Sequence, residues 1–163
     1  MPVEGNSMAD GQQFCTFVLQ GQFFGVPVQQ VQEVIRFQEM TRVPLVSEVI
    51  SGLINLRGQI VTAVDLRRCL GMTDRPVGQL PINVVIRTND GPVSLLVDEI
   101  GDVVEVDQNT FETVPETLHG AARAMVHGVY KLPERMLLEL DITRTLAAVD
   151  PAKESSLAQP INP

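Results

Sequence analysis

Near the middle of the chain, two aliphatic segments are separated by only two residues, Arg57 and Gly58. Residues 52–56 and 59–64 are rich in β-branched and other aliphatic side chains, which are typical of strands. Because glycine adopts a positive φ without strain, a two-residue turn at Arg57-Gly58 would join them into a β-hairpin. The glycine suits this turn. The arginine needs a separate explanation, because Asn, Asp or Gly would fit its position better.

Neither arm of this hairpin alternates cleanly between apolar and polar side chains. Residues 60–61 and 63–64 put aliphatic groups on both faces of the second arm, and residues 53–54 do so in the first. Strands that are buried on both faces show this pattern, whereas a strand with one solvated face alternates. We therefore expect a hairpin held between two packed bodies, as in two small barrels that share a central apolar layer.

Short aliphatic runs separated by turn signals continue along the chain. The strand-like segments are 13–20, 22–26, 34–37, 52–56, 59–64, 82–87, 93–97, 103–106, 126–132 and 136–140. Asn89-Asp90-Gly91 is a strong hairpin turn between two of them. Their spacing is near the 8–12 residues typical of an all-β sandwich or barrel. The sequence thus predicts an all-β fold.

Few helices are expected. Asp is a preferred N-cap residue, so Asp65 and Asp141 predict short helices at 66–70 and 142–148. Residues 27–31 have room for one helical turn.

The two ends of the chain differ in composition from the rest. Residues 1–11 are small and polar, and residues 150–163 are rich in Pro, Ser and Ala, so both are expected to be flexible tails. Between them, residues 12–149 form one domain with two lobes.

Charge and hydropathy exclude several classes of protein. The formal net charge of −8 argues against binding to nucleic acid or to anionic membranes, which attract basic surfaces. No signal peptide is evident, and no apolar run approaches the roughly 20 residues that span a bilayer, so membrane insertion is not expected. Cys15 and Cys69 lack metal-ligand spacing and are expected to be small buried apolar residues in a reducing, cytoplasmic compartment.

The sequence offers little catalytic chemistry. Common catalytic and nucleotide-binding motifs are absent, and neither His119 nor His127 has a neighbouring ligand residue, so we expect no metal, no cofactor and no catalytic residue. Acidic residues gather at 98–107, where a solvated turn is the simpler explanation. An enzyme that uses this acidic cluster with one of the histidines is the alternative.

The charged residues around the central hairpin allow both structural and functional interpretations. Arg67 and Arg68 are expected on the exposed side of the short helix, and Glu33 could serve either role. The guanidinium of Arg57 could bind carboxylates or carbonyl groups of a partner in a bidentate manner. It could equally fold back and pair with Glu33 or Asp65.

The pattern G-x-x-N-L-R-G-x-I-x-x-x-x-D-L-R at 52–67 indicates function more specifically than any single charged residue does. With the surrounding segment 31–71, it closely resembles the CheW-type chemotaxis coupling proteins. The resemblance extends to 14–34, 93–106 and 132–146, so that it covers most of the chain.

This resemblance implies a fold, a function and a set of site residues. The fold would be two intertwined five-stranded SH3-like β-barrels around a shared hydrophobic layer. The protein would be a non-enzymatic adaptor that couples the cytoplasmic tip of chemoreceptors to the regulatory domain of the histidine kinase CheA, in membrane-associated arrays. By matching position, the implied receptor-binding residues are Val31, Glu33, Gly52, Asn55, Arg57 and Gly58, and the implied kinase-binding residue is Met40.

Several alternatives remain open within this family. The same domain also occurs at the end of CheA and fused to a receiver in CheV, but this chain is too short for a kinase core or a receiver. A stand-alone adaptor is therefore expected. The pathway could drive flagella or be of a pili-associated or other type. A small-molecule sensor that binds in the layer between the barrels is a further alternative.

Overall fold

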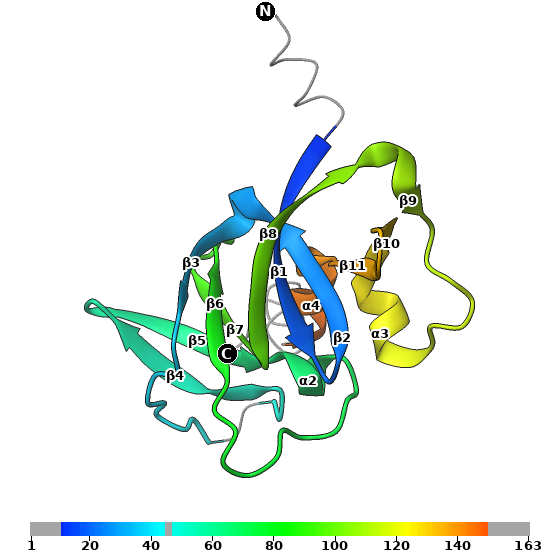
Figure 1. The fold of residues 1–163 in the computed structure, drawn as a ribbon. Coiled ribbons are helices and arrows are strands. Elements are labelled where there is room, and N and C mark those ends of the chain that lie inside the picture. The colour runs from blue at the N-terminus through cyan, green and yellow to red at the C-terminus, as the bar shows by residue number, and fades with distance from the viewer. Residues whose placement is uncertain (1–10, 45–46, 150–163) are drawn as a thin grey trace, which may run out of the picture.

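The computed structural model describes residues 11–44 and 47–149, and shows a mainly β chain with a few short helices (Figure 1). The predicted tails at 1–11 and 150–163 fall outside these residues, except that the first strand begins at Gly11. The six-stranded sheet has the order β8 (Glu99–Asp107), β1 (Gly11–Leu19), β2 (Gln22–Pro27), β11 (Met136–Leu140), β10 (Val126–Lys131) and β9 (Phe111–Glu112). The five-stranded sheet has the order β3 (Val31–Ile35), β6 (Ile82–Ile86), β7 (Val93–Val97), β5 (Gln59–Asp65) and β4 (Ile50–Leu56). Both sheets are mixed, because β11 pairs with β2 and β5 pairs with β7 in parallel.

The helical segments are short and mostly begin where the sequence predicts. They are η1 (Val28–Gln30), α2 (Leu66–Cys69), η2 (Gln108–Thr110), α3 (Gly120–Met125) and α4 (Ile142–Val149). The carboxylate of Asp65 accepts the backbone N–H of Arg67 at 3.0 Å, and that of Asp141 accepts the N–H of Arg144 at 3.0 Å. Both predicted N-caps are therefore confirmed.

Several elements differ from the sequence prediction. The strand expected at 34–37 begins three residues earlier, because β3 pairs with β6 from Val31 onward. The strand expected at 103–106 extends over Glu99–Asp107, where pairing with β1 overrides its polar residues. The two-residue strand β9 and the helix α3 carry too short a pattern to be predicted.

The buried apolar side chains form three clusters. The largest takes Phe17 and Phe24 from the six-stranded sheet and Ile86 and Leu95 from the five-stranded sheet, so the two sheets share an apolar layer. A second cluster lies within the five-stranded sheet and includes Ile54. The third lies within the six-stranded sheet and includes Phe14 and Tyr130. The two free cysteines, Cys15 and Cys69, are buried as predicted, and burial raises the pKa of Cys69 to about 12.

The β4–β5 hairpin is only partly enclosed. At its base, Ala63 packs into the cluster within the five-stranded sheet and Val64 into the shared layer. Farther out, the side chain of Ile60 is 60% exposed, and the tip of the hairpin extends away from the rest of the chain (Figure 1). The prediction of a hairpin buried on both faces is thus correct for the base and wrong for the tip.

The chain that follows β3 turns back onto β4. Thr41 and Leu53 exchange two backbone hydrogen bonds, of 2.9 and 2.8 Å. Because β3 and β4 are the two ends of the strand order, this bridge places the segment that follows one edge strand against the other edge strand. Within the described residues, no helix is long and apolar enough to cross a membrane.

Candidate functional site

The tip of the β4–β5 hairpin is a two-residue turn, as predicted. Leu56 pairs with Gln59, and the intervening Arg57 and Gly58 have φ values of 51° and 90°. The side-chain oxygen of Asn55 accepts the backbone N–H of Gly58 at 2.8 Å, which stabilises the turn. Positive φ is disfavoured for an arginine, so the backbone at Arg57 is strained. The turn itself does not require an arginine at this position.

Arg57 pairs with Glu33 of β3 across the sheet. Its Nη2 donates to Oε2 of Glu33, and the two side chains are 71% and 21% exposed. The hydrogen bond from Arg57 lowers the pKa of Glu33, and the same bond raises the pKa of Arg57. Of the two carboxylates that the sequence offers to Arg57, Glu33 is the one it binds, whereas the carboxylate of Asp65 caps α2. Most of the guanidinium surface still faces solvent.

Val31 and Glu33 are held on an irregular part of β3. The register of β3 against β6 shifts between these two residues. Val31 is half-buried against the shared apolar layer, and its carbonyl accepts Nη1 of Arg87 at 2.8 Å.

Gly52 and Met40 lie together at the base of the hairpin. A Cβ atom on Gly52 would stand 2.6 Å from the carbonyl oxygen of Thr41 and 3.1 Å from the Cβ atom of Met40. A glycine is therefore needed for the chain after β3 to bridge to β4. Met40 is half-buried and packs against the cluster within the five-stranded sheet.

Two exposed aliphatic residues of the same sheet were not identified from the sequence. Val34 of β3 is 40% exposed and Ile60 of β5 is 60% exposed. Their apolar neighbours in the sequence made both appear to be core residues. Only the pairing of the strands shows that these side chains face solvent.

A second arginine–carboxylate cluster lies where β7 passes into β8, and we call it the Asp98 network. It consists of Asp98, Arg67, Arg75 and the backbone amide of Gln20. Arg67 binds both carboxylate oxygens of Asp98, at 2.6 to 3.1 Å, and Nε of Arg75 binds one oxygen at 2.9 Å. The side chains of Arg67, Arg75 and Asp98 are 7%, 9% and 6% exposed.

The Asp98 network corrects two expectations. Arg67 is buried rather than on the exposed side of α2, whereas Arg68 is 43% exposed. Asp98 belongs to no solvated turn. Burial would raise its pKa, but hydrogen bonds from Arg67, from the amide of Gln20 and from Arg75 outweigh burial and lower the pKa to about 2.

The remaining candidates for catalysis stay apart. Glu99 and Asp102 are exposed, as expected for that part of the acidic cluster. His119 precedes α3 without capping it, and the exposed His127 lies with its ring 6.0 Å from that of Phe111. Within 11–44 and 47–149, no three His, Cys, Asp or Glu side chains are grouped to hold a metal ion.

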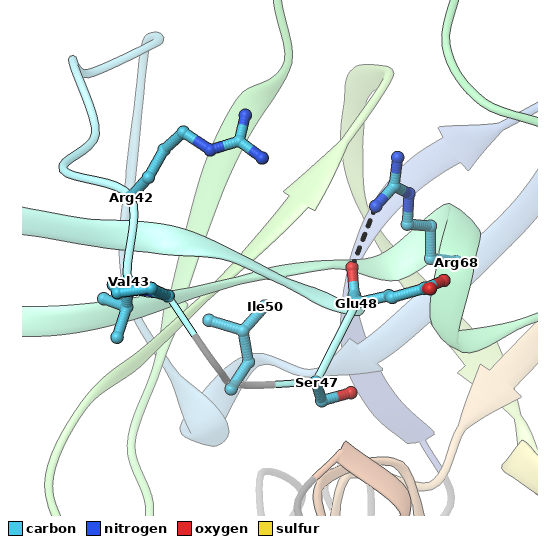
Figure 2. A pocket seen from close by; sticks show the side chains of 7 residues that line it. Arg42, Val43, Ser47, Glu48, Ile50 and Arg68 are labelled. Atoms are coloured by element: carbon cyan, nitrogen blue, oxygen red, sulfur yellow. Dashed lines mark hydrogen bonds between the residues drawn. The ribbon is translucent and has the colours of Figure 1, made fainter.

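A separate cavity of about 410 Å³ lies beside the start of β4 (Figure 2). Its lining residues are Arg42, Val43, Pro44, Ser47, Glu48, Ile50 and Arg68. The guanidinium of Arg68 donates to the Glu48 carbonyl at 3.0 Å and to both carboxylate oxygens of Asp74. This cation is thus already engaged, and none of the predicted site residues lines the cavity.

Comparison with known proteins identifies the family of the chain. The CheW-like domain family matches residues 13–150. The chain is 29% identical to Chemotaxis protein CheW of Bacillus subtilis, over 83% of this chain and 87% of that protein. It is 28% identical to Chemotaxis protein CheW of Klebsiella aerogenes, over 91% and 90%. It is also 29% identical to Protein PilI of Pseudomonas aeruginosa, over 70% of this chain and 64% of that protein.

A solved structure supports the same assignment. The crystal structure of the scaffolding protein TtCheW from Thermoanaerobacter tengcongensis superposes with a TM-score of 0.71 at 26% identity, covering 79% of this chain and 88% of that one. With the N-L-R-G-x-I hairpin formed as predicted and the family match spanning nearly all the described residues, the chain belongs to the CheW-like domain family.

Proposed function

We propose that this chain is an adaptor that couples chemoreceptors to the histidine kinase CheA. Membership of the CheW-like family, whose members are non-enzymatic adaptors, supports this role, and so do relatives named as chemotaxis and scaffolding proteins. The observation that carries the proposal is the strained, largely exposed Arg57 at a projecting hairpin tip. Strain persists in proteins chiefly where function uses it.

The receptor-binding face would be the surface around this tip. Gly52, Asn55 and Gly58 shape the hairpin, while Glu33 and Arg57 present its charges. The half-buried Val31 and the exposed Val34 and Ile60 would add the apolar contact. A helical receptor tip fits such a face, because helices dock through apolar side chains flanked by polar contacts.

Met40 remains the proposed kinase contact. It is half-buried beside Gly52, so the regulatory domain of CheA would reach only the outer part of its side chain. A contact there would lie close to the hairpin that carries Arg57, and both partners could then act on one element of the five-stranded sheet.

We infer that each sheet curls into an SH3-like barrel, although the six-stranded sheet has one strand more than the five that the resemblance implies. In the five-stranded sheet, the bridge between Thr41 and Leu53 brings the segment that follows the edge strand β3 against the opposite edge strand β4. In the six-stranded sheet, the two end strands β8 and β9 are consecutive in the chain and separated only by η2. Each sheet also has an apolar cluster of its own beside the shared layer, as two barrels would. The protein would work in the cytoplasm, recruited to membrane-associated receptor arrays.

A pili-associated pathway is the second candidate. The similarity to Protein PilI of Pseudomonas aeruginosa favours it, although that match covers less of both chains than the chemotaxis relatives do. Reconstitution with receptors and kinases from each type of pathway would separate the two.

The decisive experiment is co-sedimentation with membranes that carry chemoreceptors, with and without CheA. Wild-type protein is expected to pellet and to raise kinase activity, and Arg57→Glu should lose both effects while remaining folded. The double variant Arg57→Glu with Glu33→Arg restores the internal pair with its charges exchanged. If the pair itself matters, this variant recovers binding; if Arg57 contacts the receptor, it does not.

The proposal fails if wild-type protein pellets with neither partner. If Arg57→Glu binds as wild type does, Arg57 lies outside the coupling surface. Arg144→Glu is a matched control, because Arg144 is also an exposed arginine that is near a carboxylate, on α4 and far along the chain from the hairpin.

A further inference from the structure

Backbone strain marks a second position that the receptor-binding hairpin does not explain. Within the described residues, only Gln20 and Arg57 have positive φ without being glycine, with values of 49° and 51°. Gln20 and Gly21 form the two-residue turn between β1 and β2, as Arg57 and Gly58 do between β4 and β5. A strained residue that the structure retains is a reason to look for a function.

The strained turn at Gln20 points its amide at a buried carboxylate. The N–H of Gln20 donates to Oδ2 of Asp98 at 2.8 Å, and the backbone N–H of Asp98 donates to the carbonyl of Val18 at 3.1 Å. Asp98 is the single residue between β7, in the five-stranded sheet, and β8, in the six-stranded sheet. The point where the chain crosses from one sheet to the other is thereby tied to the β1–β2 turn.

The same carboxylate also accepts hydrogen bonds from two arginines that follow β5 of the five-stranded sheet. Arg67 lies in α2, directly after β5, and it also donates to the carbonyls of Thr73 and Asp74 at 3.1 and 3.3 Å. Arg75 reaches Asp98 from the loop that follows α2 and donates to the carbonyl of Leu96 in β7 at 3.5 Å. One carboxylate therefore has partners on segments connected to both sheets: the β1–β2 turn of the six-stranded sheet, and α2 with its following loop, which continue from β5 of the five-stranded sheet.

The shared apolar layer also joins the two sheets, but in a different way. Apolar contact is non-directional, so it sets no particular distance or angle between individual groups. Charge-assisted hydrogen bonds to a buried carboxylate require a narrow range of distances and angles. The apolar layer holds the sheets together, whereas the Asp98 network can define the angle between them.

From these observations the geometry points to a positioning role: the Asp98 network holds the two sheets in one relative orientation. This proposal rests on the proposed adaptor function for its consequence: with receptor bound at the hairpin, activation of the kinase requires this orientation of the two sheets. The network would contact neither partner. Weakening the network without removing its anion, as Arg75→Gln does, would leave both sheets folded and the receptor face intact while the coupling between partners falls.

The orientation can be measured by electron–electron distance spectroscopy between spin labels on the two sheets. Asn89→Cys in the β6–β7 turn and Glu134→Cys in the β10–β11 turn are exposed attachment sites, whereas Cys15 and Cys69 are buried and do not compete for the label. The full-length labelled protein is expected to give one narrow distance. Asp98→Asn and Arg75→Gln should broaden or shift it, and Arg57→Gln should leave it unchanged.

Asp98→Asn leaves two buried arginines without their anion and can fail to fold. Arg75→Gln then decides, because the bonds between Arg67 and Asp98 remain. The proposal is overturned if folded Arg75→Gln gives the same narrow distance as the unsubstituted protein. It is also overturned if Arg57→Gln changes the distance as much as Arg75→Gln does.

A functional measurement separates positioning from general stability. Arg75→Gln is expected to bind a receptor cytoplasmic fragment as wild type does, while its activation of CheA falls at least about fivefold. Arg75→Lys, which keeps the charge, should recover part of that activation. A parallel loss of binding and activation would contradict the coupling role. If wild type shows neither binding nor activation, the adaptor function fails, and the distance measurement still decides the positioning role.

Discussion

The exposed pair of Arg57 and Glu33 and the buried Asp98 network share their arginine–carboxylate chemistry but differ in nearly everything else. The pair of Arg57 and Glu33 lies at a projecting hairpin with the arginine 71% exposed, while the Asp98 network is almost fully enclosed. An exposed pair contributes little to stability, because water and salt screen it. A buried carboxylate with several charge-assisted hydrogen bonds is costly to disrupt, since removing one partner leaves an uncompensated charge. From this difference we infer that Arg57 serves a partner, whereas Arg67 and Arg75 serve the fold.

The largest expected effect breaks the buried site. Asp98→Ala should lower the free energy of unfolding by about 3–5 kcal/mol, because it strands Arg67 and Arg75 in a buried environment. Urea denaturation monitored by circular dichroism measures the change. Glu33→Ala, which removes the carboxylate of the exposed pair, is the matched control. Equal losses for the two variants would contradict the distinction between the sites.

Acid should also affect the buried site in a defined pH range. The folded-state pKa of Asp98 is lowered from 3.8 to about 2, so its contribution to stability is complete above about pH 4 and is lost as the pH falls toward 2. The lost stability should be about 2 kcal/mol. Unfolding curves at pH 4 and pH 2 measure it, and Asp98→Asn should show a smaller decrease over that interval. A decrease of the same size in both proteins would assign the acid sensitivity elsewhere.

The two strained turns allow a finer test. Gln20→Gly keeps the amide that Asp98 accepts and relieves the positive φ, so the free energy of unfolding should rise by up to about 1 kcal/mol. Thermal unfolding checks this change. A loss of stability would show that the Gln20 side chain, rather than its backbone, serves the network.

The smallest effect on stability is expected at the exposed pair. Arg57→Gln should leave the melting temperature unchanged, because the side chain is largely solvated. Its receptor binding should nevertheless fall about tenfold or more, as for an arginine at the centre of an interface. Calorimetric titration with a receptor fragment measures the affinity. A large drop in melting temperature with normal affinity would make Arg57 a structural residue.

Much of the local structure could be predicted because it depends on neighbouring residues. The two-residue turn at Arg57-Gly58 and the caps at Asp65 and Asp141 follow from residue types within one turn of chain. The short strand β9 and the helix α3 were missed, since pairing and packing with distant segments outweigh their weak local patterns.

Burial was predicted less well than secondary structure. Ile60 has the same aliphatic context as Val64, yet one side chain is 60% exposed and the other 1%. Arg67 and Arg68 are adjacent, yet their side chains are 7% and 43% exposed. Exposure depends on which distant element covers each residue, and a pattern of neighbours carries no such information.

The sequence by itself determined that this is a mainly β chain of the CheW-like family with a central N-L-R-G hairpin, because these features rest on local conformational preference and on a specific motif. Only the tertiary structure decided which arginine meets which carboxylate. Arg57 joins Glu33 from 24 positions away, and Arg67 joins Asp98 from 31 positions away. The path of the backbone between two residues decides whether they meet. Coulomb attraction at contact distance is similar for any oppositely charged pair, and burial determines how strong that attraction is.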